Sequence, residues 1–97
     1  MNLKDVFLSH NCVLIDFYSE DCPPCKLIES ELEKVKKHFG KNIEIYQVDQ
    51  CKQGDVFKAF NVLSLPHLKL FRSGRPVWSF TGLIAGDYII AEIKRFK

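Results

Sequence analysis

The chain has 97 residues, the size of one domain with one hydrophobic core, and we expect a single domain over residues 1–97. Apolar residues make up 46% and charged residues 27%, ordinary globular usage that excludes a disordered chain. The formal charge of +2 is too small for a nucleic-acid-binding surface, and no apolar run approaches the roughly 20 residues of a membrane span. These values predict a protein that binds neither nucleic acid nor membrane.

We expect no secretory signal in the first ten residues, because their apolar stretch is short and is interrupted by Asp5. We therefore expect a cytoplasmic protein. In a reducing cytosol, four cysteines do not form a structural disulfide framework.

The first half of the chain predicts a helix, a strand and a second helix. Residues 2–9 carry apolar side chains at helical spacing. Residues 12–18 (CVLIDFY) are nearly all apolar, β-branched or aromatic, which is typical of a strand buried on both faces. After a Cys-Pro-Pro-Cys motif, an apolar stripe predicts an amphipathic helix that ends near Phe39, and Gly40 suits its C-terminal cap.

The second half predicts three more strands and two helices. Residues 43–49 form the second strand and residues 54–60 a short helix. Residues 66–72 and 77–81 form a hairpin around a Ser-Gly turn, and residues 86–96 a final helix. One β-α-β crossover plus one β-β-α hairpin gives an α/β fold, a mixed four-stranded sheet with helices on both faces.

The motif places two thiols in the first turn of a helix that follows a strand. Unpaired N–H groups and the helix dipole stabilise a thiolate there. Cys22, at the helix start, is the expected nucleophile, and Cys25, one turn inside, is the expected resolving thiol. The alternative is a zinc pair, which needs two further ligands, and the remaining cysteines and histidines form no second close pair.

Pro23 and Pro24 suit the first helical positions but donate no N–H to the Cys22 sulfur, which leaves the Cys25 N–H as the obvious donor. Asp21 adds negative charge beside the thiolate. Both effects should raise the Cys22 pKa and make the couple more reducing. A loop stiffened by two prolines could favour either redox state, and the sequence leaves that sign open.

Asp16 is the one charged residue in the strand at residues 12–18. A buried carboxylate needs a partner or a raised pKa, so this position is a candidate for proton transfer. The alternative is a solvated, inert carboxylate at a frayed strand edge.

In its motifs and element order, the chain resembles the thioredoxin family. The resemblance rests on residues 14–18, residues 22–26, Ser64-Leu65-Pro66 and Thr81-Gly82, with an Asp before the dithiol and a strand-opening Pro well after it. Three departures stand out. The family's N-terminal strand is missing, Asp21 replaces a tryptophan, and Ile45 lies near the place of the family's lysine beside the buried Asp.

The resemblance implies a thioredoxin fold and a thiol–disulfide oxidoreductase that reduces protein disulfides. It implies a monomer, recycled by thioredoxin reductase, that needs no bound cofactor or metal because the dithiol carries the electrons. Asp16 would assist proton transfer with Cys25, and the Leu65–Pro66 bond would be cis, so that the Leu65 backbone could pair with an extended substrate. The implied substrate-binding residues are Tyr18, Pro23, Pro24, Leu65, Pro66 and Gly82.

Other functions remain open at this point. An oxidase or isomerase of the same fold would favour a lower Cys22 pKa and an exported chain. Glutaredoxin-type chemistry would need a glutathione pocket, and none can be read here. A binding or scaffold module would not need an intact Cys-x-x-Cys. Cys12 is expected to fill the strand core, and Cys51 to be an incidental surface cysteine or a regulatory or dimerising thiol.

Overall fold

The computed structural model describes residues 2–96. The elements are, in chain order, α1 (Leu3–Ser9), β1 (Cys12–Tyr18), α2 (Pro23–Phe39), the 3₁₀ turn η1 (Gly40–Asn42), β2 (Glu44–Asp49), α3 (Gly54–Ala59), β3 (His67–Arg72), β4 (Arg75–Thr81) and α4 (Gly86–Arg95). Each helix and strand predicted from the sequence is present, with bounds that differ by at most two residues. None of the helices in this part of the chain is long and apolar enough to cross a membrane.

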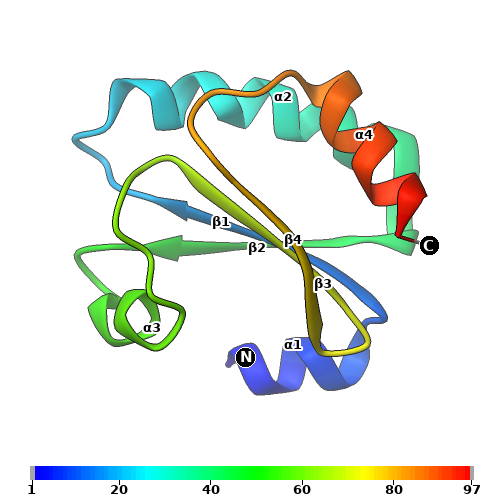
Figure 1. Cartoon of the computed structure of the whole chain (residues 1–97), viewed down its shortest axis with the longest axis horizontal. Coiled ribbons are helices and arrows are strands. Elements are labelled where there is room, and N and C mark those ends of the chain that lie inside the picture. Colours follow the sequence, from blue (N-terminus) through cyan, green and yellow to red (C-terminus); the bar gives the residue numbers. More distant parts are fainter. Residues whose placement is uncertain (1, 97) are drawn as a thin grey trace.

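The four strands form one mixed sheet in the order β2-β1-β3-β4. β1 pairs in parallel with β2 and antiparallel with β3, and β3 pairs antiparallel with β4. Figure 1 shows α2 and α4 on one face of the sheet and α1 and α3 on the other. The predicted α/β architecture, a mixed four-stranded sheet flanked by helices, is therefore confirmed.

β1 is the centre of the core because helices cover both of its faces. Its side chains alternate between two clusters, as strand geometry requires. Leu14 packs with Ile28 of α2 and Ile89 of α4, whereas Phe17 belongs to the cluster under α1 and α3. The rings of Phe17 and Phe57 meet edge to face, with centroids 5.2 Å apart. The prediction that residues 12–18 form a strand buried on both faces is therefore confirmed.

The hairpin between β3 and β4 is tighter than the sequence indicated. Ser73 and Gly74 have φ angles of 51° and 79°, the left-handed conformation that two-residue hairpin turns need. Because two residues complete the turn, pairing resumes at Arg75. The fourth strand therefore begins two residues before its predicted start at residue 77.

The helices α2 and α4 come very close together at Gly86. The Gly86 N–H donates to Glu31 Oε1 over 2.8 Å, so a side chain of α2 caps a helix for which Ala85 offers no side-chain cap. This hydrogen bond, followed by that from Lys34, holds the pKa of Glu31 below its usual value. A Cβ at Gly86 would lie 2.7 Å from the backbone oxygen of Glu31.

Gly86→Ala should therefore lower the free energy of unfolding by about 1–3 kcal/mol, since the added methyl group forces the two helices apart. Urea denaturation followed by circular dichroism measures the change. Gly54→Ala is the matched control, because a Cβ at this helical glycine would meet no atom within 4 Å. Equal losses of stability in the two variants would show that the contact between α2 and α4 is not the cause.

Candidate redox site

The predicted site residues come from three segments that meet at one end of the sheet. Phe17, near the end of β1, pairs with His67 at the start of β3, and His67 pairs with Thr81 at the end of β4. The dithiol follows β1, the Leu65–Pro66 segment precedes β3, and Gly82 follows β4. Figure 1 shows these connections at the same end of the sheet, beside the start of α2.

Cys22 and Cys25 form a disulfide with a Cα–Cα distance of 5.3 Å, so the structure describes the oxidised site. Cys22 is the N-cap of α2, with extended backbone, and is half-buried, whereas Cys25 is only 2% exposed. Pro23 and Pro24 occupy the first two helical positions. The Cys25 N–H lies 3.3 Å from Cys22 Sγ and donates to it, as the sequence predicted.

The surroundings of the dithiol are acidic. Glu20 and Asp21 are exposed directly before Cys22. Partial burial raises the pKa of Tyr18, at the end of β1, and the negative charges of Asp49 and Glu20 raise it further. An environment that disfavours a phenolate also disfavours a thiolate, because both are anions.

Asp16 is fully buried, which excludes the solvated strand-edge alternative. Its Oδ2 accepts a hydrogen bond of 3.4 Å from Gln47 Nε2 of β2, and no group among residues 2–96 bonds its Oδ1. Burial raises the pKa of Asp16 to about 6, against the lowering effect of Gln47 and with a further raising effect of Glu29. By strand alternation Asp16 shares the face of Leu14, which is the face that α2 covers with its buried Cys25.

The loops before β3 and after β4 are tied together beside the dithiol. The Leu65–Pro66 bond is cis, as the resemblance implied, and the Gly82 N–H donates to the Pro66 carbonyl over 2.8 Å. Gly82 has a φ of 112°, a conformation that side-chain-bearing residues rarely adopt. Leu65 is half-buried and Pro66 buried.

His67 is a strand residue in the structure. Its Nδ1 lies 2.7 Å from Thr81 Oγ1, which joins the ends of β3 and β4. Burial lowers its pKa, and Lys69 lowers it further, so the imidazole is neutral at pH 7.

The other two cysteines lie outside this constellation. Cys12 is buried at the start of β1, in the core beneath α2 and α4. Cys51 is exposed in the loop after β2, and its N–H donates to Asp49 Oδ1 over 3.0 Å. Over residues 2–96, His, Cys, Asp and Glu side chains form no group of three that could hold a metal ion.

Sequence reasoning missed Gln47 as the hydrogen-bond partner of Asp16. It considered Ile45, near the place of the family's lysine, but Ile45 pairs with Leu14 in the parallel register. The next residue on the same face of β2 is Gln47, which pairs with Asp16. The period-two spacing from Ile45 was the available signal, but the register that decides the pair is not local.

The chain belongs to the thioredoxin family, whose model matches residues 2–95. It is 32% identical over 84 residues to a thioredoxin-like protein of Synechocystis, covering 87% of this chain and 80% of that protein. It is 32% identical over 89 residues to thioredoxin of Mycobacterium tuberculosis, covering 92% and 77%. A mutant thioredoxin from Halobacterium salinarum has a similar structure, with a TM-score of 0.89, 28% identity, and 97% and 81% of the two chains covered.

A segment of mouse protein disulfide-isomerase A4 is also similar, at 38% identity over 78 residues. That match covers 77% of this chain but only 12% of the isomerase, so the chain spans about one eighth of that relative. Family membership establishes a thiol–disulfide oxidoreductase with a redox-active cysteine pair and protein disulfides as the substrate class. Both a reductase and an isomerase fall within this class.

Asp16→Asn should stabilise the fold more at pH 8 than at pH 5. A carboxyl group whose folded pKa is raised, here from 3.8 to about 6, destabilises the fold once the pH exceeds its unfolded value, and the penalty is complete above the folded value. The gain from the substitution should therefore grow by about 1.4 kcal/mol between the two pH values. Urea denaturation at both pH values measures it. A variant less stable than wild type at pH 8 would mean that the carboxylate is effectively paired.

Proposed function

We propose that the protein is a thioredoxin-type reductase of protein disulfides, acting as a monomer and as one domain over residues 1–97. The proposal includes a reducing compartment, the cytoplasm, and recycling by a thioredoxin reductase. The observation that carries it is the asymmetric dithiol: a half-buried Cys22 at the start of α2 and a fully buried Cys25 one turn inside. The Cys22 thiol is accessible to a protein disulfide, whereas the buried Cys25 thiol can react only with Cys22.

The reaction follows from that asymmetry. The Cys22 thiolate attacks one sulfur of the substrate disulfide, and the other substrate sulfur leaves as a thiolate and is protonated. Asp16 then takes the proton of Cys25, and the Cys25 thiolate attacks Cys22 Sγ. The Cys22–Cys25 bond forms, the bond from Cys22 to the substrate breaks, and the second substrate thiolate takes a proton. The substrate gains two electrons and two protons, and the dithiol supplies both electrons without a bound cofactor.

Substrate positioning is assigned to the segments around the dithiol. The hydrogen bond between Gly82 and Pro66 supports this assignment, because it holds two loops together at the end of the sheet where Cys22 lies. An extended substrate segment would pair with the Leu65 backbone, as strand-adding peptides do. The proposed contact residues are Tyr18, Pro23, Pro24, Leu65, Pro66 and Gly82.

Cys22→Ser should abolish insulin reduction, and Cys25→Ser should accumulate mixed disulfides between Cys22 and the substrate. The reason is that only Cys22 is accessible for the first attack, whereas Cys25 is needed to release the substrate. Turbidity of insulin with dithiothreitol as the electron source measures the first effect, and non-reducing electrophoresis the second. Cys51→Ser is the control, since that thiol is exposed but lies after β2, and it should leave both readouts unchanged. Trapping by Cys22→Ser instead would reverse the two roles.

An isomerase is the second candidate, favoured by the similarity to a segment of protein disulfide-isomerase A4. The local electrostatics favour the reductase. Prolines at the first two helical positions supply no N–H to Cys22 Sγ, and Glu20 and Asp21 add negative charge. A poorly stabilised thiolate destabilises the reduced form and makes the couple more reducing.

We therefore expect a reduction potential of about −230 to −280 mV, near the reducing end of the range for such dithiols. Equilibration with glutathione redox buffers, followed by acid quenching and thiol alkylation, measures it. Pro23→His is the companion variant, because an N–H donor and a titratable cation next to Cys22 should shift the potential toward oxidising values. A wild-type value above about −180 mV would favour the isomerase.

A further inference from the structure

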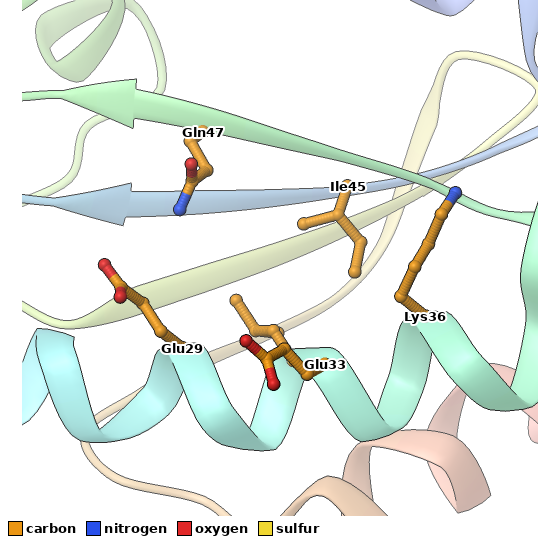
Figure 2. A pocket seen from close by; sticks show the side chains of 6 residues that line it. Glu29, Glu33, Lys36, Ile45 and Gln47 are labelled. Carbon is orange, nitrogen blue, oxygen red and sulfur yellow. The ribbon is translucent and has the colours of Figure 1, made fainter.

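A cavity of about 310 Å³ lies between α2 and β2, and it leads to the hydrogen-bond partner of Asp16. Its lining residues are Glu29, Leu32, Glu33, Lys36, Ile45 and Gln47. β2 is one of the two edge strands of the sheet in the described chain, so the cavity is open to water on that side. Figure 2 shows that Glu29 projects from α2 and Gln47 from β2, with their polar ends facing each other.

The positively charged residue of the cavity wall, Lys36, is held away from Gln47. Lys36 reaches from α2 to β2, and its Nζ donates to the Ile43 carbonyl over 2.8 Å. Figure 2 places this lysine at the opposite end of the cavity from Glu29 and Gln47. The polar groups nearest Asp16 on this side are therefore a neutral amide and a carboxylate.

The Gln47 amide distinguishes the two oxygens of Asp16. Gln47 Nε2 donates to Oδ2, whereas Oδ1 is buried and receives no hydrogen bond from the described residues. An amide N–H that is already donating to Oδ2 stabilises the carboxylate and limits rotation of the carboxyl group. Oδ1 is then the oxygen available to accept a proton.

We propose that Gln47 is a positioning residue for the resolving step: it holds Asp16 by Oδ2 so that Oδ1 takes the Cys25 proton, and Glu29 is the charged residue that faces Gln47 across the cavity. The inference rests on the proposed function, since it concerns the step in which Cys25 is deprotonated. In that step the Cys25 S–H bond breaks, the Asp16 O–H bond forms at Oδ1, and the electron pair stays on sulfur for the attack on Cys22.

The charges around Asp16 are few, so the two effects should be separable. On α2 the charged residues that line the cavity are Glu29, Glu33 and Lys36, and the titratable neighbour of Asp16 on β1 is Tyr18. The residue opposite Asp16 on β3 is the apolar Leu68. Of the two cavity glutamates, Glu29 raises the pKa of Asp16, whereas Glu33 is not among the causes of its shift.

The test is a ¹³C-carboxyl NMR titration of Asp16 in the oxidised protein, with the resonance assigned by its loss in Asp16→Asn. Gln47→Met, which keeps the length of the side chain but removes the donor, should move the midpoint up by about one pH unit. Glu29→Gln should move it down by a smaller amount, since a repelling charge is removed. Glu33→Gln, a charge change of the same kind on the same wall, should leave the midpoint in place.

The rate of substrate release from the mixed disulfide, measured against pH, should shift in the same direction as the titration in each variant. A merely structural role for Gln47 would change the urea midpoint and leave both pH midpoints unmoved, and that result would overturn the proposal. Gln47 and Glu29 are exposed, so their variants should fold. Failure of the wild type to reduce insulin would reject the proposed function alone, because the titration needs neither substrate nor turnover.

Discussion

Burial of one carboxyl group in the central strand is the constraint on which the site depends. β1 lies between β2 and β3, and helices cover both of its faces, so a side chain at its centre is removed from water. Among residues 2–96 Asp16 accepts one hydrogen bond, from Gln47, and burial raises its pKa to about 6. The same sheet order brings the dithiol, Pro66 and Gly82 to the end of that strand. The architecture of the core thus places a carboxyl group with a pKa of about 6 on the face of the sheet that α2 covers with its buried Cys25.

The elements of this fold could be predicted from the sequence because their signals are local. The apolar run at residues 12–18 and the helical stripe that ends at Phe39 each lie within one element, and the redox motif lies within four residues. The partner of Asp16 could not be predicted, because Gln47 faces it only through the parallel register of β1 and β2, two segments far apart in the chain. The approach of Gly86 to Glu31 is likewise a contact between distant segments. The cis bond before Pro66 was predictable from the family but not from the residues, since proline is also common at a strand start.

One departure from the family, Ile45 near the place of the lysine, bears on the proton affinity of Asp16. A lysine beside a buried carboxylate would hold its pKa down by direct charge attraction. Here the nearby position holds Ile45, and the hydrogen bond comes from the neutral amide of Gln47, while Lys36 is bound to the Ile43 carbonyl. A neutral donor stabilises the carboxylate less than a cation does, so desolvation remains the largest effect. With Ile45 near the lysine's place and only an amide donor at Gln47, no cation of the described chain offsets the desolvation that raises the pKa of Asp16 to about 6.

The proton affinity of Asp16 is matched to the proposed chemistry of the Cys22–Cys25 pair. Two prolines at the start of α2 and acidic residues before Cys22 leave the Cys25 N–H as the hydrogen-bond donor that the described chain offers to Cys22 Sγ. A thiolate at the buried Cys25 is favoured still less, because burial penalises it further. A carboxylate with an ordinary pKa near 4 would be too weak a base to deprotonate such a thiol, and a permanently protonated one would be inert. A pKa of about 6 leaves Asp16 largely ionised at pH 7 yet able to take a proton, so a couple as reducing as the one proposed above would be served by this buried carboxyl group.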